Sequence, residues 1–560
     1  MLSNIATVSR NKAINMCVSW KSATSFMNFY RNDPFMDLMY KRHPRTLGDF
    51  VVPSKKRVFR FSTLKKVGKT PKKIDRDPAF DYVCSLGYDF EKQTLNRVRS
   101  LYDSRLELSG PGMNMNRKYA LTYKAIKKGN VDIIIHGVVR NYTNQTYGCP
   151  DLIVKGKTLY RLGVHTPVQP DTYYAVDIKA STIDLRAGGG IVNTYSVLGY
   201  KSQIMIYTHA LNEMQDNTSD SVGFVLGKKY KFLSGNTYES HQMLATVDFK
   251  TYDSNIVEYL QDAINWLNWV DLNGDNPDAV YPEEEMMYPN MKNTYNGPYT
   301  KIKEQYAEHI DELTRMWNIG VKERSIAFKH KIRRLSDMKD VTNVGICPKS
   351  KTGNILQKMI DTTHSDQILS IPSQNNVLGW RNRTDEEWFL DVETVDNIVY
   401  MIGVKTPERY TCLVADGLYS DYEKGILTEL IMMMEKRNPV VWTWSGYDQR
   451  VLLDRMKTHN MVMPPSVWKD MCHVFKNHEN PIGVKGALGY GLKDISKALS
   501  YYDYIPNHYE DLKCMNGLES IIQAKKAYNE NDWETMENII KYNKADCLSL
   551  HDILQSIRSN

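Results

Sequence analysis

The chain has 560 residues, of which 42% are hydrophobic and 24% are charged, and its formal net charge is +7. This balance is typical of a soluble globular protein, and the length suggests about two to four domains. No apolar run reaches the length of a membrane span, and no compact apolar segment near the start resembles a secretory signal. The eight cysteines are scattered without a CxxC pair. This argues against a disulfide framework and predicts an intracellular, reducing compartment such as cytoplasm or nucleus.

The first 75 residues are basic and weakly patterned. Between Lys41 and Lys73 there are twelve Lys or Arg residues and one acid, Asp49, with three phenylalanines interleaved. Such a stretch suits contact with a phosphate backbone. It equally suits a solvated basic arm or a contact with an acidic face of the same protein, and these alternatives stay open.

Strand and helix patterns alternate from residue 76 to about 275. The elements predicted there are strands 131–141, 172–181 and 221–233 and helices 193–214 and 252–274. A connection rich in Pro, Asn and acids follows, and a helical pattern resumes near 301–335. We therefore expect a helical linker over 276–380.

Strands and helices alternate again from residue 381 to the end. The predicted elements are strands 387–394, 397–405, 409–415 and 438–444, a helix at 421–436 and further helices after it. Two α/β domains joined by a helical segment are the simplest organisation.

The first of these later strands carries Asp391 and Glu393 inside an apolar run. Residues two apart on a strand share a face, and unpaired charges are costly to bury. Other Asp-x-Glu pairs, such as Asp89 and Glu91, lie in polar or helical context, where a structural role suits them. For the buried pair, a divalent cation is the economical compensation.

Further carboxylates follow in order along the chain. Asp448 lies where an apolar strand ends and a helix begins, and Tyr542 and Asp546 lie four apart on a C-terminal helix, so they share a face. The ordered set resembles the DEDDy exonuclease family on an RNase H-like fold. The resemblance implies a 3′–5′ exonuclease in which Tyr542 orients the attacking water and two Mg²⁺ or Mn²⁺ ions hold the scissile phosphate. The implied ligands of these two ions are Asp391, Glu393, Asp448 and Asp546.

Residues 481–499 look like the segment that precedes the final helix in RNase H-like domains attached to RecB-type nucleases. Lys493 and Asp470 are candidates for a contact with phosphate or metal. Such residues are more often surface or loop contacts, so neither is counted among the predicted catalytic residues.

A second constellation lies upstream. Asp151 follows a turn and precedes an apolar strand, and Asp177 and Lys179 lie two apart on one face of another strand. Gln203 and Tyr207 lie four apart on a predicted helix. Other Asp-x-Lys pairs occur, but only this one follows both an apolar strand and an upstream Pro-Asp.

Together these residues resemble the PD-(D/E)XK nuclease fold in its RecB-like branch. The resemblance implies that Asp151 and Asp177 bind one or two Mg²⁺ or Mn²⁺ ions, with the backbone carbonyl of Ile178 as a further ligand. Lys179 would position the water and offset charge in the transition state. The residues implied to contact the DNA strand near the cut are Gln203 and Tyr207.

The sequence departs from this fold at one point, because the fold often supplies a further Glu or His from its first helix. That helix is expected at 115–128, which contains neither. His136 is nearby, but an isolated His on an apolar strand is more often a packed residue. The alternative is a degenerate nuclease fold that binds DNA without cutting it. Some relatives carry iron–sulfur cysteines in the linking region, but none lies between Cys149 and Cys347, so we predict no iron–sulfur cluster.

The sequence thus predicts an α/β (α+β) protein with a PD-(D/E)XK restriction-endonuclease-like fold and an RNase H-like fold joined by a helical linker. The predicted parts are a basic region 1–75, a RecB-like nuclease domain 76–275, a linker 276–380 and a DEDDy domain 381–560. The predicted function is hydrolysis of DNA, as single strands or duplex ends, in replication, repair or recombination. Fused nucleases of this kind occur in bacteria and large DNA viruses. The alternatives are a DNA-binding scaffold serving a helicase, polymerase or packaging complex, and an RNA exonuclease.

Overall fold

The computed structural model describes residues 19–42, 78–110, 113–164, 167–217, 221–276, 279–435 and 437–560. Most of the basic stretch between Lys41 and Lys73 lies outside these residues. The chain divides into two compact units, Met1–Ala307 and Glu308–Asn560. The division falls inside the segment 276–380, and each unit is described by itself.

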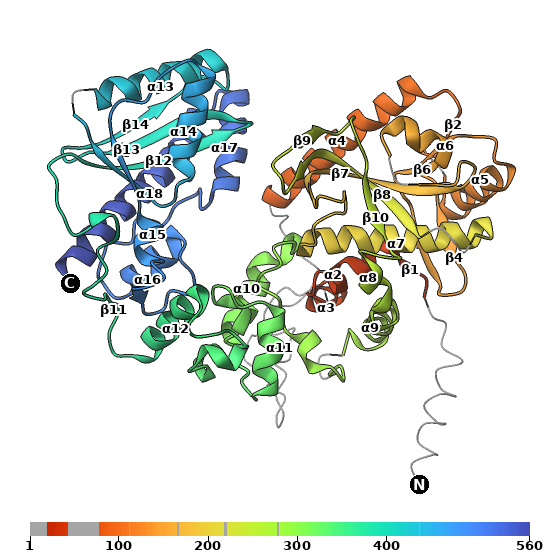
Figure 1. Cartoon of the computed structure of the whole chain (residues 1–560), viewed down its shortest axis with the longest axis horizontal. Helices are drawn as coiled ribbons and strands as arrows, with labels where there is room; N and C mark the ends of the chain where they lie inside the picture. The colour runs from red at the N-terminus through yellow and green to blue at the C-terminus, as the bar shows by residue number, and fades with distance from the viewer. Residues whose placement is uncertain are drawn as a thin grey trace, which may run out of the picture. The chain divides into compact units, whose positions relative to one another are not determined.

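The N-terminal unit is built on a mixed sheet of seven strands (Figure 1). The strands of the unit are β1 (Lys21–Ser22), β2 (Arg105–Glu107), β3 (Ile133–Ile135), β4 (Val139–Asn141), β5 (Thr146–Gly148), β6 (Leu152–Lys155), β7 (Tyr173–Leu185), β8 (Val222–Phe232), β9 (Thr237–Glu239) and β10 (Ala245–Asp248). The large sheet runs β10-β8-β7-β6-β3-β2, with β9 paired to β8, and a small sheet runs β1-β5-β4. Strand β7 is antiparallel to β6 and parallel to β8.

Helices surround these two sheets. They are α2 (Met27–Tyr30), α3 (Phe35–Arg42), α4 (Pro78–Leu101), α5 (Met115–Lys128), α6 (Gly156–Leu159), α7 (Tyr195–Gln215), α8 (Ser254–Glu258), α9 (Leu260–Asn273) and α10 (Thr300–His309). Helix α7 begins after Thr194, whose side chain accepts a hydrogen bond from the Val197 N–H and so caps the helix. The described residues near the N-terminus belong to this unit: Asp33 and Lys303, both without exposed side-chain surface, form an ion pair at 2.6 Å.

Several predicted elements of this unit are confirmed, and two are wrong in extent. The strands at 172–181 and 221–233 and the helix at 193–214 correspond to β7, β8 and α7. The strand expected over 131–141 is two strands, β3 and β4, in different sheets. His136 lies between them with φ 54°, and a left-handed residue ends an extended run. The helix expected over 252–274 is divided at Tyr259 into α8 and α9.

The C-terminal unit is built on a five-stranded sheet of order β14-β13-β12-β15-β16. Its strands are β11 (Leu369–Ser370), β12 (Glu387–Val395), β13 (Ile398–Lys405), β14 (Tyr410–Val414), β15 (Val440–Thr443), β16 (Val467–Asp470) and β17 (Gly483–Val484). Strands β12, β13 and β14 form an antiparallel meander, whereas β15 and β16 continue from β12 as parallel strands. Strands β11 and β17 form a separate pair. The predicted strands of this unit are confirmed to within two residues at each end.

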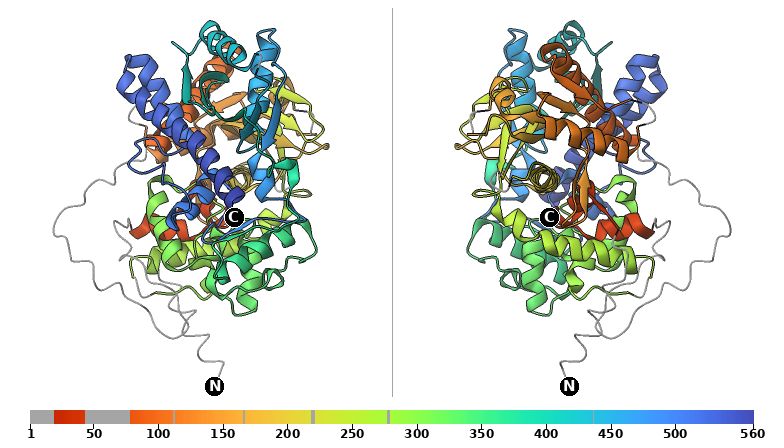
Figure 2. Two further views of the ribbon diagram at one scale, coloured as in Figure 1. Left: turned by 90° about the vertical axis from the view of Figure 1, so that its left-hand side faces the viewer. Right: turned by 90° about the vertical axis from the view of Figure 1, so that its right-hand side faces the viewer.

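The helices of this unit are α11 (Val321–Lys329), α12 (Lys351–His364), α13 (Ser420–Met434), α14 (Tyr447–Thr458), α15 (Met471–Phe475), α16 (Leu492–Tyr501), α17 (Gly517–Glu530) and α18 (Trp533–Ser559). Figure 2 gives two further views, in which α17 and α18 lie side by side. The helical pattern expected over 301–335 is two helices, α10 and α11, which belong to different units.

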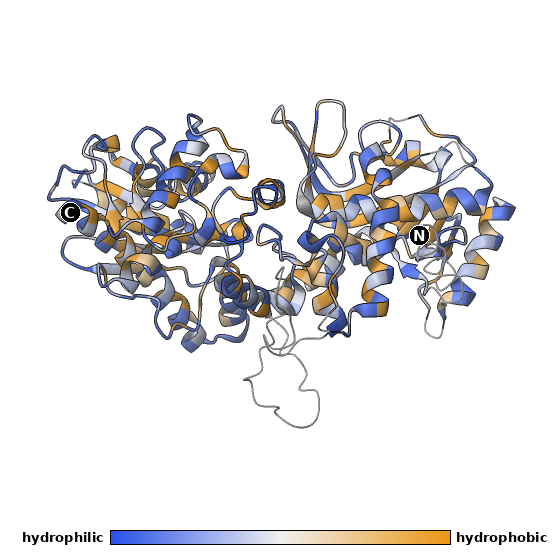
Figure 3. Cartoon of the chain, turned by 90° about the horizontal axis from the view of Figure 1, so that it is seen from below, coloured by the Kyte–Doolittle hydropathy of each residue, from blue (hydrophilic) through white to orange (hydrophobic). Residues whose placement is uncertain are grey.

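Both faces of the β12 sheet are covered, and successive residues of β12 enter different cores. Trp388, Leu390 and Val392 pack with residues of α13 and α14, whereas Phe389 packs with the apolar face of α18. Figure 3 shows the apolar residues gathered on the strands and on the inner helix faces. Because side chains alternate along a strand, Asp391 and Glu393 share the Phe389 side, which faces α18.

None of the helices within the described ranges combines the length and the apolar composition needed to cross a bilayer.

Candidate active sites

The carboxylates predicted in the C-terminal half converge beside β12, the central strand of the sheet. Asp391 and Glu393 lie on β12, and the neighbouring parallel strand β15 leads into α14, whose first turn contains Asp448. Helix α18 packs against β12 and β13 and contributes Tyr542 and Asp546. Neighbouring parallel strands finish at the same end of a sheet. This is why Asp391 and Asp448, more than fifty positions apart in the chain, lie near each other.

Three of the four carboxylates form a compact oxygen cluster. One carboxylate oxygen from each of Asp391, Glu393 and Asp546 lies within 4.8 Å of the others. Asp448 is outside this group. It is nevertheless buried, with 7% of its surface exposed, and its charge raises the pKa of Asp391 and that of Glu393. Hard carboxylate oxygens are the donors that Mg²⁺ and Mn²⁺ prefer, so the cluster fits such an ion.

Each carboxylate of the cluster accepts a hydrogen bond from a residue that the sequence analysis missed. Asn543 Nδ2 donates to Asp391 Oδ2 at 2.8 Å. Ser520 Oγ donates to Glu393 Oε2, and the Tyr509 hydroxyl donates to Asp546 Oδ1, both at 2.5 Å. Asn543 was findable, because it adjoins Tyr542 on the same helix; Ser520 and Tyr509 stand in segments without a motif.

Gly403 on β13 lets α18 approach the strand that carries Asp391. It is paired with Asp391 across the β12–β13 ladder. A Cβ at Gly403 would lie 1.6 Å from Asn543 Oδ1, so any other residue would displace the side chain that holds Asp391.

Tyr542 is buried, and a lysine occupies the space beside it. Lys493 Nζ donates to the Tyr542 hydroxyl at 2.9 Å and also to the Met515 carbonyl. The structure therefore brings Lys493, which the sequence analysis set aside, into the site. Asp470 instead caps α15 by accepting from the His473 N–H at 3.2 Å.

The carboxyl groups of this site resist ionisation. Burial raises the pKa of Glu393 to about 8 and that of Asp448 to about 7. Hydrogen bonds oppose both shifts, and the negative charge of Asp546 adds to them. Burial also raises the pKa of Asp391, to which the charges of Asp546 and Glu393 add, and burial raises that of Asp546. A cation between the carboxylates would remove this penalty, because it stabilises the charged forms.

In the N-terminal unit the β6–β7 ladder sets Asp151 beside Asp177. Leu152 pairs with Val176 in an antiparallel ladder, so Asp151, just before β6, lies opposite Asp177, which follows Val176 on β7. The Ile178 N–H donates to Asp151 Oδ2 at 2.6 Å, and Lys179 Nζ lies 2.5 Å from Asp177 Oδ2. The predicted PD-(D/E)XK residues are thus brought together.

The charges of this site are strongly coupled. Burial, and then the charge of Asp177, raises the pKa of Asp151 well above its ordinary value. Burial by itself would lower the pKa of Lys179, but the Asp177 and Asp151 carboxylates outweigh it and raise that pKa. Lys179 therefore stays protonated and neutralises part of the acidic pair.

A glutamate of α4, which the sequence analysis gave a structural role, and a histidine between β3 and β4 lie beside Asp151. Glu91 on α4, His136 and Asp151 offer ligand atoms that lie within 4.8 Å of one another. His136 Nε2 lies 2.9 Å from Glu91 Oε1, and its Nδ1 lies 2.8 Å from Ser109 Oγ. His136 thus has a polar partner at each ring nitrogen, and an acid of α4, rather than of the helix at 115–128, lies beside Asp151.

The two residues predicted to contact DNA are both buried, with Gln203 6% and Tyr207 4% exposed. Lys179 Nζ donates to Gln203 Oε1 at 3.3 Å, so Gln203 belongs to the site. Tyr207 packs over Gly148, where a Cβ would lie 2.1 Å from its ring.

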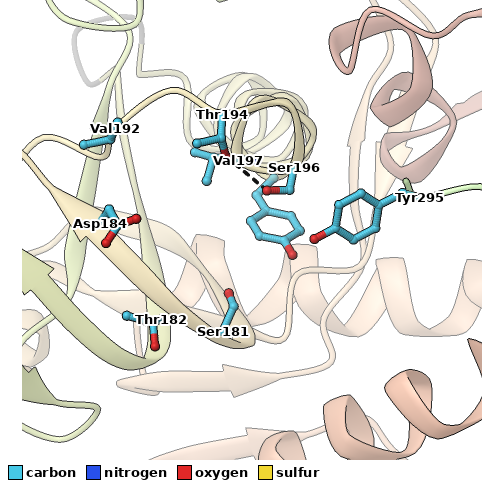
Figure 4. Close-up of a pocket in the computed structure, with 9 residues that line it drawn as sticks. Ser181, Thr182, Asp184, Val192, Thr194, Ser196, Val197 and Tyr295 are labelled. Atoms are coloured by element: carbon cyan, nitrogen blue, oxygen red, sulfur yellow. Dashed lines mark hydrogen bonds between the residues drawn. The ribbon is translucent and has the colours of Figure 1, made fainter. Parts of the chain in front are cut away.

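A pocket of about 150 Å³ adjoins the N-terminal site (Figure 4). Ser181 and Thr182, which follow Lys179 on β7, line it together with Tyr200, whose ring centre is 5.0 Å from Lys179 Nζ. Its wall also contains Tyr295 and the start of α7. Six of its nine lining residues carry a hydroxyl group, which suits hydrogen bonding to a polar ligand.

Comparison with known proteins bears on the C-terminal unit. A search of curated proteins finds no match to the chain. A protein-family model described as RNase H superfamily matches residues 388–558, which contain the whole cluster of Asp391, Glu393, Asp448 and Asp546. A domain of this superfamily indicates binding of nucleic acid and a nuclease-type, hydrolytic function. The C-terminal half of this mixed α/β protein therefore contains an RNase H-like domain, at residues 388–558.

Proposed function

We propose that the chain is a metal-dependent nuclease that hydrolyses phosphodiester bonds of DNA, with a 3′–5′ exonuclease site in its C-terminal half. The observation that carries the proposal is the buried cluster of Asp391, Glu393 and Asp546 inside an RNase H-like domain. Three acids kept within 4.8 Å of one another are costly to a fold unless they hold a cation.

The chain's own residues have distinct tasks in this proposal. Asp391, Glu393, Asp448 and Asp546 hold two Mg²⁺ or Mn²⁺ ions, which when bound supply Lewis-acid stabilisation of charge on the phosphate. Asn543 and Ser520 keep two of the carboxylates in place through their hydrogen bonds. Tyr542 orients the attacking water.

The N-terminal unit would form a second nuclease site of PD-(D/E)XK type. Glu91, His136, Asp151 and Asp177 would hold one or two ions of the same kind, and Lys179 would position water. The ligand group formed by Glu91, His136 and Asp151 favours an active site over a degenerate fold that only binds DNA.

The proposed arrangement is a nuclease domain over 76–275 and an exonuclease domain over 381–560, joined through 276–380. Single-stranded DNA or duplex ends would be the substrate, in replication, repair or recombination, in a reducing intracellular compartment. A helicase or a replication protein would be a natural partner, since a duplex must be opened before an exonuclease can digest one strand.

One assay tests these assignments. End-labelled single-stranded DNA, duplex DNA and RNA are incubated with the wild type, Asp391→Asn, Asp177→Asn and the double variant, in Mg²⁺, Mn²⁺ or EDTA. Asp385→Asn, an exposed acid just before β12, is the control. We expect metal-dependent degradation of DNA that the double substitution abolishes.

The other outcomes separate the alternatives. Degradation that survives the double substitution would contradict both site assignments. Degradation of RNA alone would identify an RNA exonuclease, and binding of DNA without degradation would identify a scaffold.

A further inference from the structure

Lys493 has three contacts inside the C-terminal site. It lies in the first turn of α16, and its Nζ donates to the Tyr542 hydroxyl at 2.9 Å and to the Met515 carbonyl. The same ammonium lies 4.2 Å from the ring centre of Tyr542 and 5.6 Å from that of Tyr509. These contacts hold the half-buried Lys493 side chain in one place.

The contact between Lys493 and Tyr542 fixes which hydrogen bond the Tyr542 hydroxyl accepts and which it can donate. A lysine ammonium has three donors and no acceptor, so the Tyr542 oxygen must accept from it. The Tyr542 O–H is then free to donate toward the carboxylates, of which Asp546 lies four residues later on the same face of α18. Without Lys493 the hydroxyl could rotate and accept from water instead, which would reverse the bond it offers to the reacting centre.

Tyr509 completes the arrangement from the other side. Its hydroxyl donates to Asp546 Oδ1 at 2.5 Å. Asp546 therefore accepts from Tyr509, and the ammonium of Lys493 lies beside the rings of Tyr509 and Tyr542. This is the one lysine among the described residues that bonds to Tyr542, and it brings positive charge to an otherwise acidic cluster.

We propose that Lys493 is a positioning residue of this site, which acts through Tyr542 by holding its hydroxyl as a donor toward the reacting centre. The inference rests on the proposed nuclease function of the C-terminal site. It adds a residue that lies outside the carboxylates and the tyrosine of the predicted pattern.

The test is a double-substitution cycle in the full chain. The variants compared are Lys493→Met, Tyr542→Phe and the double variant. The control is Lys497→Met, which replaces an exposed lysine one turn later on α16. We expect Lys493→Met to lower kcat on single-stranded DNA on the order of 10- to 100-fold with little change in KM, as for a misplaced catalytic group. In the Tyr542→Phe background the same substitution should have almost no further effect, because the two residues act as one unit. Lys493→Arg should restore most of kcat.

A second measurement does not depend on activity. Mn²⁺ binding to each variant is measured by calorimetry, together with thermal unfolding. Because Lys493 repels a bound cation, Lys493→Met should bind Mn²⁺ as tightly as the wild type or more tightly. Weaker Mn²⁺ binding together with a lower Tm would mean that Lys493 only supports the fold, which overturns the inference.

The kinetic outcomes separate this inference from the function on which it rests. If the wild type is active and sensitive to Asp391→Asn, but Lys493→Met behaves like Lys497→Met, the inference fails alone. A raised KM with an unchanged kcat would assign Lys493 to substrate binding and overturn it as well. A wild type without activity sensitive to Asp391→Asn refutes the proposed function, and the inference with it.

Discussion

The two candidate sites are made of similar side chains but are assembled in different ways. In the C-terminal site the acids stand on one strand and on the helices α14 and α18 that pack around it, in chain order and each within a recognisable local pattern. In the N-terminal site Asp151, Asp177 and Lys179 come from one strand pair, whereas Glu91 comes from a helix sixty residues earlier. An acid within a recognisable local pattern can thus be found from the sequence even on a distant helix, whereas Glu91, which stands in an ordinary helical pattern, cannot.

The side chains that contact the acids also differ between the two sites. The C-terminal acids are held by neutral donors, and Lys493 contacts Tyr542. In the N-terminal site Lys179 lies against Asp177 itself. We therefore expect the C-terminal site to depend more strongly on added cation than the N-terminal site.

The largest expected effect comes from removing one ligand charge at each site. Asp391→Asn should lower 3′–5′ degradation of single-stranded DNA by more than about 100-fold, since even residues that only support a metal ligand are worth about 10- to 100-fold. Asp177→Asn should leave that reaction intact and affect only the second activity. The rates are followed on gels with 5′-labelled and 3′-labelled strands. If one substitution abolished both activities, the two sites would not be independent.

The next effect is the stabilisation of the C-terminal unit by a cation, and its dependence on pH. In EDTA the folded chain keeps protons on Glu393 and Asp448 up to about pH 8 and pH 7, whereas the unfolded chain loses them near the ordinary values of 4.5 and 3.8. The free energy of unfolding should therefore fall as pH rises through this window, by up to about 1.4 kcal/mol per pH unit for each group.

Mg²⁺ should reverse this loss. At 100 times its dissociation constant it should stabilise the unit by about 2.7 kcal/mol at pH 8, and by less at pH 5, where protons compete. Thermal unfolding with and without Mg²⁺ at both pH values measures the difference. Equal stabilisation at both pH values would argue against these carboxyls as ligands, and Asp391→Asn provides the control.

Glu91→Gln tests whether α4 completes the N-terminal site. The substitution keeps the size of the side chain but removes a charged ligand beside His136 and Asp151, so Mn²⁺ affinity of that site should fall about 10- to 100-fold. Asp89→Asn, an exposed acid two residues earlier on the same helix, is the matched control. Binding is measured in the Asp391→Asn background, so that only the N-terminal site contributes. An unchanged Mn²⁺ affinity would favour the alternative that the N-terminal unit is a degenerate nuclease fold that binds DNA without cutting it.

The smallest effect is expected from Ser520→Ala, which removes the hydrogen bond to Glu393 Oε2. That bond lowers the pKa of Glu393 against the effect of burial, so its loss should raise the pKa further and reduce Mn²⁺ affinity about tenfold at neutral pH. The reduction should shrink as the pH is raised, because Glu393 then ionises in both proteins. Titration of Mn²⁺ at two pH values measures this, and a loss independent of pH would point to a displaced strand instead.

Much of the C-terminal unit could be predicted from the sequence, because its signals are local. The apolar run of β12, with acids two residues apart, and the spacing of Tyr542 and Asp546 express the periods of a strand and a helix. The predicted strands of this unit are found within two residues of their expected ends. The predicted role of each carboxylate remains to be tested by the substitutions above.

Contacts between segments that share no periodic pattern became visible only in the folded chain. His136 takes a left-handed conformation that divides an apparently continuous strand and turns its ring toward Glu91. Ser520 and Tyr509 reach the C-terminal acids, and Lys493 reaches Tyr542, because α16, α17 and the loop between them lie against α18. Local periodicity fixes which face of an element is buried, but which distant side chain meets that face depends on how the elements pack.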